Sequence, residues 1–379
     1  SALIFNRSDN LTYAGVISGS GTLQKKGAGV LSLTGGNLYT GATTITTGTL
    51  SIGDGGTSGS IAGNIATSAI LRFNRSDNLS YGGVISGTGA LQKQGAGTLT
   101  LAGNNTYSGT TTISGGTLLL TGNKSGTGTT TVNAATNLHI GNGGVVGAIA
   151  GNIVDNGTVV FNRSDAITYA SVISGLGVLQ QLGSGVLTLT GTNTFTGGTT
   201  ISSGTLQIGA GGTVGSIVGN VLNNAALIFN RSNSLTYAGV ISGVGTLTKL
   251  GLGALTLTGN NTFTGNTTLS AGSLSIGSGG TSGSIAGNII DNSALIFNRS
   301  DNLTYAGVIS GSGTLQKQGA GNLTLAGVNL YTGQTFFNQG RININQDANL
   351  GTGGALTFNG GILQNTADLT TNRIATLNV

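Results

Sequence analysis

The sequence repeats itself over a long and nearly fixed period. The segment Phe-Asn-Arg-Ser occurs five times, and its arginine falls at Arg7, Arg75, Arg163, Arg231 and Arg299. The intervals between these arginines in the numbering are 68, 88, 68 and 68. Near-identical copies at a fixed period are typical of architectures built from stacked units. The chain is therefore expected to stack copies of one element rather than to close a single globular core.

A shorter period lies inside the long one. The one long interval exceeds the others by a single 20-residue step, and Gly287, Gly307 and Gly327 end similar segments at the same step. An element that can be added singly, in short and equal steps, is one coil of a solenoid. The next equivalent step is longer and completes the 68-residue repeat. We therefore expect three coils in each repeat and one extra coil near residues 121–140.

The composition and the local patterns favour strands over helices. The 379 residues include 72 Gly and no Pro, and apolar residues alternate with polar ones, as in Leu31-Ser32-Leu33. Gly is a poor helix former and alternation with period 2 is typical of strands. The sequence therefore predicts an all-β chain, a right-handed parallel β-helix with coils of about 20 residues. In the first repeat the expected strands are Ala2–Asn6, Leu11–Ser18, Thr22–Gln24, Val30–Thr34, Thr43–Ile45 and Thr49–Ile52.

We expect one continuous β-helix over residues 1–379. Its repeat units are about 3–70, 71–158, 159–226, 227–294 and, in part, 295–340, and residues 341–379 continue the coils. Residues 1–19 are identical to residues 293–311, so the chain begins inside a unit. We therefore expect a window on a longer array or a link in a filament.

The residue inventory argues against catalysis, metals and nucleic acids. The chain has no Cys, a single His and no Glu, and charged residues make up only 6%. His139 is isolated, and the recurring aspartates fall once per repeat, so no carboxylate pair of a polysaccharide-processing enzyme is expected. No run of basic residues suits a nucleic acid, despite the net charge of +5. We expect no catalytic, cofactor-binding or metal-binding residues.

Two rows of basic residues are the candidate surface contacts. In four repeats an Asp follows the recurring arginine by two residues, whereas Asn233 follows Arg231, and this pattern predicts exposed local ion pairs. The lysines Lys25, Lys93, Lys249 and Lys317 form a second row, in which Gln181 stands in the third copy. We expect them to be solvated and to discourage aggregation. The alternative is a weak contact row for anionic surfaces or glycans.

Three series of aromatic residues follow the same register. Phe5 and Tyr13 each begin a series that recurs in all five repeats. The third series consists of Tyr39, Tyr107, Phe195, Phe263 and Tyr331. We expect packing in the core or in turns, and the Tyr/Phe exchange in the third series suggests that the ring matters more than the hydroxyl group. The alternative is a periodic external platform for sugar rings.

One segment carries a family resemblance. The sequence Gly-Thr-Leu-Gln-Lys-Gln-Gly-Ala-Gly-Asn-Leu-Thr-Leu-Ala-Gly of residues 313–327 resembles the passenger-associated transport repeat, also called the autotransporter-associated β-strand repeat. Copies start at Gly21, Gly89, Gly177, Gly245 and Gly313. The fifth copy departs from the pattern at Phe336-Phe337 and Arg341.

The resemblance implies a surface or secreted protein of a Gram-negative bacterium. Its passenger would be a right-handed β-helix, exported through an outer-membrane β-barrel translocator that lies outside this segment. The family's usual roles are adhesion, self-association and biofilm formation, with host, abiotic or glycan surfaces as partners. Glycan binding or polysaccharide processing is the alternative function, and a Thr-rich ice-binding face is a third.

Overall fold

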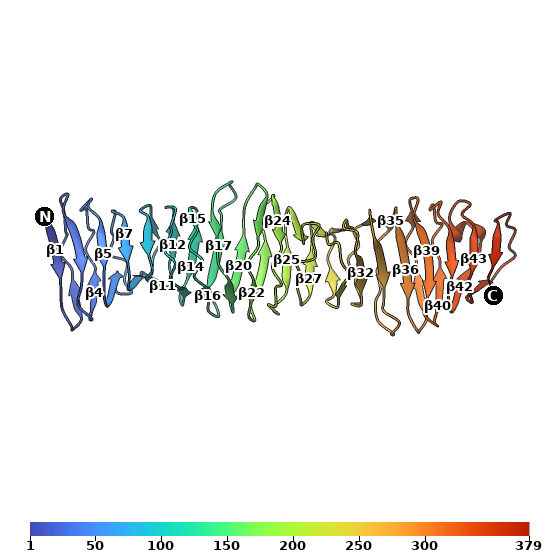
Figure 1. Ribbon diagram of the computed structural model, residues 1–379, viewed down its shortest axis with the longest axis horizontal. Coiled ribbons are helices and arrows are strands. Elements are labelled where there is room, and N and C mark those ends of the chain that lie inside the picture. The colour runs from blue at the N-terminus through green and yellow to red at the C-terminus, as the bar shows by residue number, and fades with distance from the viewer. Residues whose placement is uncertain (379) are drawn as a thin grey trace. The chain divides into compact units, whose positions relative to one another are not determined.

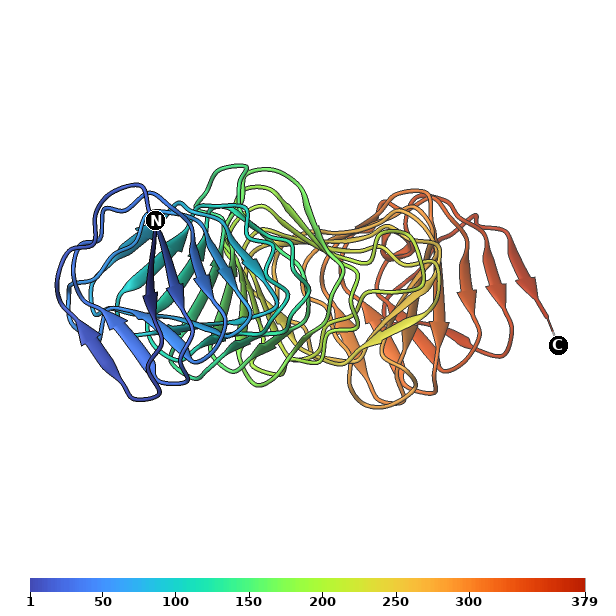
Figure 2. The same cartoon turned by 60° about the vertical axis from the view of Figure 1, so that its left-hand side comes forward.

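The structure is a computed structural model that describes residues 1–378. Apart from the short 3-10 helix η1 (Asp347–Leu350), every described element is a β-strand, and the strands pair in parallel. The chain divides into two compact units, residues 1–187 with 191–197 and residues 188–190 with 198–379. Within each unit the chain winds in stacked coils, and the strands of successive coils lie side by side (Figures 1 and 2). Each unit is therefore a parallel β-solenoid, as the sequence predicts.

The first unit contains three long sheets and one short pair. The first sheet has the order β1 (Ala2–Phe5), β3 (Thr22–Lys25), β5 (Thr43–Ile45), β7 (Ile65–Thr67), β10 (Ile85–Gly87). The second has the order β2 (Leu11–Tyr13), β4 (Val30–Leu33), β6 (Thr49–Ile52), β8 (Ile70–Asn74), β11 (Ala90–Gln94), β13 (Thr111–Ile113), β16 (Thr130–Val132), β19 (Ile153–Asp155), β22 (Ile173–Ser174). The third has the order β9 (Leu79–Tyr81), β12 (Thr98–Leu101), β14 (Thr117–Leu120), β17 (Asn137–Ile140), β20 (Thr158–Phe161), β23 (Val178–Gln181), and β15 (Asn123–Lys124) pairs with β18 (Ala148–Ile149). Strands β21 (Ile167–Tyr169) and β24 (Val186–Leu189) lie in the sequence around the boundary between the two units.

The second unit repeats this arrangement. One sheet has the order β25 (Thr199–Ile201), β27 (Val221–Asn223), β30 (Ile241–Ser242). A second has β26 (Thr205–Ile208), β28 (Ala226–Phe229), β31 (Thr246–Lys249), β33 (Thr267–Leu269), β35 (Ile289–Asp291), β38 (Ile309–Ser310). A third has β29 (Leu235–Tyr237), β32 (Ala254–Leu257), β34 (Ser273–Ile276), β36 (Ala294–Asn298), β39 (Thr314–Gln318), β41 (Thr335–Phe337), β43 (Leu356–Phe358), β45 (Ala375–Leu377), and the fourth has β37 (Leu303–Tyr305), β40 (Asn322–Leu325), β42 (Arg341–Ile344), β44 (Ile362–Asn365).

All six strands expected in the first repeat form. The main difference is that the strand starting at Leu11 ends at Tyr13 rather than at Ser18, because the chain bends at Gly15. The region 121–140, where an extra coil is expected, contains β15, β16 and β17. The prediction of one continuous β-helix over the whole chain stays a prediction, since the structure defines two units.

The register shows how the long repeat relates to the coil. Leu235 lies beside Leu255, which lies beside Leu274, which lies beside Leu295, so three coils bring the chain from position 235 to position 295. The 68-residue repeat is longer than these three coils by about one strand and its turn. Accordingly β1, β8 and β20, which occupy the same place in three successive copies, belong to three different sheets of the first unit. Each repeat is thus three coils plus one further face, and equivalent residues move from one face to the next.

Inward-facing side chains form the core of each unit. Along most strands every second residue is buried, and these are mainly Leu, Ile and Val, such as Leu31 and Leu33 in β4. Apart from Phe5 and Tyr13 in the first coil, which are only partly buried, the first two aromatic series lie in this core, as expected. Phe73 and Tyr81, for example, have ring centroids 5.7 Å apart, and the hydroxyl group of Tyr81 donates to the carbonyl oxygen of Gly63 at 2.7 Å. Most strands bury their inward-facing apolar side chains against those of the coils above and below. This burial supplies the hydrophobic stabilisation that a chain with few apolar residues needs.

Candidate functional site

The recurring arginines fasten a glycine-rich loop to the coil. Arg75 makes a two-pronged pair with Asp77, with distances of 2.8 Å from Nε and 2.6 Å from Nη2. Its Nη1 donates to the carbonyl of Gly59 at 2.7 Å and its Nη2 to that of Thr57 at 2.6 Å. Planar guanidinium groups suit such convergent acceptors. The loop of residues 53–60 is therefore a turn that Arg75 fastens to the coil.

The expectation of exposed ion pairs holds for only one copy. The Arg7 side chain is 54% exposed and pairs with Asp9. The side chains of Arg75, Arg163 and Arg299 are only 11–14% exposed because the loop carbonyls cover them. In the remaining copy Arg231 donates to Asn233 instead. The N–H groups of these partly buried arginines are already hydrogen-bonded within the chain, so few of them are left to bind another molecule. Hydrogen bonds from the arginines hold the pKa values of Asp77, Asp165 and Asp301 below the ordinary range.

The prediction that the lysine row is solvated is wrong. Lys25, Lys93, Lys249 and Lys317 are only 2–3% exposed. Each faces inward, with its stem packed in the core between neighbouring strands. Lys93, for example, lies between Phe73 of β8 and Ile113 of β13. These residues cannot form a contact row for anionic surfaces or glycans.

The buried ammonium groups bind backbone carbonyls at a turn. Lys93 Nζ donates to the carbonyl oxygens of Gln94, Gly95 and Gly115 at 2.8–2.9 Å. Gln181 does the same in its copy, donating to Gly183 and Gly185 at 2.9 and 3.1 Å. The position of Lys93 and Gln181 therefore requires a long side chain with a hydrogen-bond donor at its end, and not a positive charge. Burial lowers the pKa values of Lys93 and Lys317 to about 8.

Sequence reasoning missed a fifth member of this group. Lys124, in the region of the extra coil, is buried and donates to the carbonyl oxygens of Gly126 and Gly128 at 2.7 and 3.0 Å. Its Nζ also lies 5.3 Å from the ring centroid of Tyr107. The signal was available, because every lysine of the group stands two residues before a glycine.

The third aromatic series is buried, as expected, so the external sugar platform is not formed. Tyr39, Tyr107, Phe195, Phe263 and Tyr331 are all 0–1% exposed. The hydroxyl group nevertheless has a role, since Tyr39, Tyr107 and Tyr331 each share a hydrogen bond of 2.6–2.7 Å with a threonine four residues later. The expectation that the ring matters more than the hydroxyl group was incomplete, because the sequence alone does not show that the hydroxyl group meets an inward-facing threonine.

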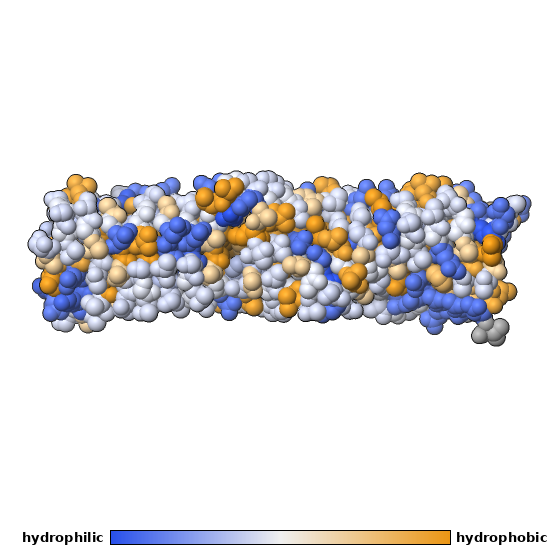
Figure 3. All heavy atoms as spheres, turned by 45° about the horizontal axis from the view of Figure 1, so that its top comes forward, coloured by the Kyte–Doolittle hydropathy of each residue, from blue (hydrophilic) through white to orange (hydrophobic). Residues whose placement is uncertain are grey.

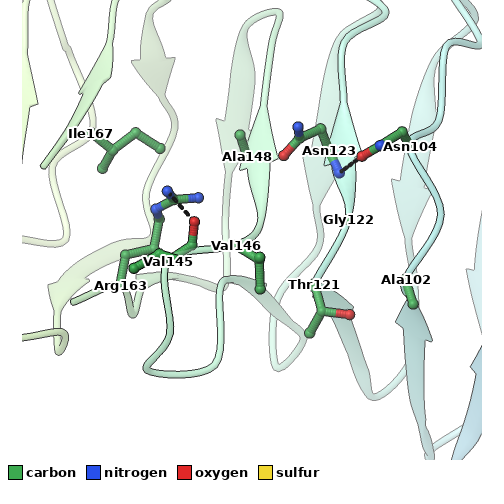
Figure 4. Close-up of a pocket in the computed structure, with 10 residues that line it drawn as sticks. All are labelled: Ala102, Asn104, Thr121, Gly122, Asn123, Val145, Val146, Ala148, Arg163 and Ile167. Carbon is green, nitrogen blue, oxygen red and sulfur yellow. Dashed lines mark hydrogen bonds between the residues drawn. The ribbon is translucent and has the colours of Figure 1, made fainter. Parts of the chain in front are cut away.

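An open groove lies in the first unit. It has a volume of about 540 Å³ and is bordered by Val145, Val146 and Ile167 on one side and by Asn104 and Asn123 on the other (Figure 4). The guanidinium group of Arg163 lies at its edge and is occupied by Asp165 and by the carbonyls of Val145 and Gly147. The groove offers amides and apolar side chains but no free acid or base.

The acidic residues and the single histidine of the described part of the chain do not gather into a metal-binding cluster. No group of three or more His, Asp or Glu residues with suitable geometry occurs among residues 1–378. His139 lies on β17 between Leu119 and Val160 of the neighbouring strands, and burial lowers its pKa. Nor does any described helix have the length and apolarity to cross a bilayer.

Five segments of the solenoid match the model of a known family of sequence repeats. The family model "Passenger-associated-transport-repeat" matches residues 23–52, 91–120, 179–208, 247–276 and 315–344. Five segments of the chain, each of 30 residues, are similar to the passenger-associated transport repeat. The match confirms the resemblance of residues 313–327 to this repeat. Each passenger repeat begins in the strand that carries the buried lysine or glutamine and ends in the second strand after the third-series aromatic residue.

The chain is also similar to part of a curated protein. The chain is 33% identical over 239 residues to the adhesin BmaC autotransporter of Brucella suis biovar 1 (strain 1330). This match covers 61% of the chain but only 6% of that much longer protein. No solved structure matches the chain.

Proposed function

We propose that this chain is a non-catalytic part of a surface-exposed autotransporter passenger that promotes adhesion. The observation that carries the proposal is the set of five passenger repeats, together with the similarity to a protein named as an adhesin. Such a passenger would reach the surface of a Gram-negative cell through an outer-membrane translocator and remain there or be released. Its partners would be host, abiotic or glycan surfaces, or further copies of itself.

The distribution of variable residues supports contacts at the turns. Copies of the repeat are nearly identical inside but differ at exposed turn positions. Leu176 and Val244 stand where other copies have Ser20, Thr88 and Ser312, and both are well exposed. On the face shown in Figure 3, hydrophobic residues accordingly form separate small patches among polar ones. Adhesion would then be the sum of several weak contacts.

The experiment is an in-frame deletion of residues 1–379 in the native gene. We expect reduced attachment to host cells and abiotic surfaces, reduced cell aggregation and reduced biofilm, each restored by the intact gene. Matched strains carrying Leu176→Ser or Val244→Ser separate the turn contacts from the scaffold. Unchanged behaviour of the deletion strain in all assays, with the remaining passenger detected at the surface, would overturn the proposal.

A further inference from the structure

Two buried aspartates have a role that neither adhesion nor the passenger repeat explains. Asp155 ends β19 and Asp291 ends β35, and both are fully buried. One carboxylate oxygen of each accepts a backbone N–H at 3.0 Å, from Gly157 and from Ser293. The other oxygen, Oδ2, is buried without any hydrogen-bond partner. Neither aspartate takes part in the ion pairs found among residues 1–378.

Another copy of the repeat shows which group suits this position. Asn223 stands at the equivalent place at the end of β27. Its Oδ1 accepts the N–H of Ala225 at 3.2 Å, as in the aspartate copies, and its Nδ2 donates to the carbonyl of Thr246 at 2.9 Å. The site therefore provides one donor and one acceptor. An ionised carboxylate has no donor, whereas a protonated carboxyl group has the same donor and acceptor pattern as the amide.

The neighbouring groups do not supply a compensating charge by contact. Asp291 lies next to Leu269 of β33, and the ammonium group of Lys249, one strand further away, is directed to the carbonyls of Gly251 and Ala271. Burial and, to a smaller extent, the charge of Asp291 raise the pKa of Tyr331, but the hydroxyl group of Tyr331 is hydrogen-bonded to Thr335 and not to Asp291. Asp155 lies next to Val132 of β16, and Lys93 is two strands beyond that. An unpaired buried charge is costly, so the neutral acid is favoured.

We propose that Asp155 and Asp291 are proton-binding sites, at which the protonated carboxyl group donates to the carbonyl of Val178 or Thr314 and holds two neighbouring coils together. The proton is bound in mildly acidic surroundings and is released as the pH approaches neutrality. The coils that carry these residues are then joined more weakly. Burial raises the pKa of both carboxyl groups to about 6, in agreement with this arrangement.

The sign of the pH effect follows from linkage. The folded state binds the proton more tightly than the unfolded state, whose aspartate has a pKa of about 3.9. The stabilisation is therefore complete below that value and is lost as the pH rises through about 6. Between pH 7 and pH 5 we expect the local opening equilibrium at each site to shift about tenfold towards the closed form.

The test uses NMR spectroscopy on the intact chain. We expect the carboxyl carbons of Asp155 and Asp291 to titrate above pH 5, and the hydrogen-exchange protection factors of the Gly157 and Ser293 amides to rise about tenfold from pH 7 to pH 5. Asp155→Asn and Asp291→Asn should remove this rise and keep high protection at pH 7. Asn223→Asp should introduce it at Ala225.

Asp301→Asn is the matched control, because Asp301 is an exposed partner of Arg299 and its counterpart in the neighbouring copy is Asn233. This variant should leave the acid-side gain at Ser293 unchanged. Titration of the buried carboxyl groups below pH 4 in the wild-type chain would overturn the proposal, and that measurement does not depend on the folding of any variant. So would a protection factor that keeps its pH dependence after both substitutions. Because none of these measurements involves adhesion, failure here leaves the proposed function untouched.

Discussion

The hydroxyl groups of Tyr107 and Thr111 lie 2.7 Å apart inside one coil and share a hydrogen bond. In the fourth copy Phe263 replaces the tyrosine, and the buried Oγ1 of Thr267 is left without a partner. The same loss occurs beside Phe195, where Thr199 Oγ1 has no partner. Two copies of the repeat therefore each carry a buried threonine hydroxyl group whose partner is missing.

Phe263→Tyr should stabilise the chain. The added hydroxyl group would restore the bond to Thr267, and a buried hydrogen bond contributes about 1 kcal/mol. Chemical denaturation of the variant should therefore show a higher midpoint than the wild type. Tyr107→Phe is the reciprocal control and should destabilise by a similar amount. A lower midpoint for Phe263→Tyr would mean that this coil lacks room for the oxygen.

Lys93→Gln should be tolerated, whereas Lys93→Met should not. Glutamine keeps a donor for the turn carbonyls, as Gln181 does in its own copy. Methionine fills the space but leaves the carbonyls of Gln94, Gly95 and Gly115 without this donor, which costs roughly 1–3 kcal/mol. Equilibrium unfolding in urea measures both variants. Equal stability of the two would show that only the length of the side chain matters.

The buried lysines should make the chain more stable as the pH rises from about 8 towards 9.5. The pKa of Lys93 is lower in the folded chain than in the unfolded one, so the unfolded state binds more protons and stability rises with pH. We expect a gain on the order of 1 kcal/mol from Lys93 in this window. Lys93→Gln should show a correspondingly smaller gain, and an identical pH profile for the two proteins would contradict the assignment.

Arg299→Lys should loosen the loop of residues 277–284. A lysine cannot reach Asp301 and the carbonyls of Thr281 and Gly283 at the same time, as the guanidinium group does. We expect faster hydrogen exchange and faster proteolysis within this loop, with little change elsewhere. Arg7→Lys, at the exposed copy, is the control and should have almost no effect. Unchanged exchange in the loop would show that its own turns hold it.

The sequence predicts the coil well because each coil obeys one local rule. Alternation of apolar and polar residues, with Gly at the corners, identifies strands such as Thr43–Ile45 and Thr49–Ile52 to the residue. The same rule predicts burial of Phe73 and Tyr81, whose spacing fits the inward face. Local patterns therefore predict where the strands lie and which of their side chains face the core.

Two features could not be predicted from local patterns: the burial of the lysines and the face on which each copy of the repeat lies. Both depend on residues in other coils. Lys93 alternates in phase with the core residue Leu91, but its charge favours a solvent position, and only the carbonyls of the turn and of the next coil reverse that preference. Likewise Asp291 cannot be told from a surface aspartate without the register that places it beside Leu269. The sequence also predicts three coils in each 68-residue repeat, the last of them longer, whereas these coils all span about 20 residues and the remaining residues occupy one further face.

That mismatch has a consequence for how such genes change length. If recombination removed one 68-residue copy from the first unit, the strands that follow it within that unit would keep their packing but shift by one face, about a third of a turn. Loss of a single coil would shorten the stack and leave every face where it was. Gain or loss of whole copies therefore rotates the exposed residues that follow about the axis of the solenoid. Gain or loss of single coils only shifts those residues along the axis.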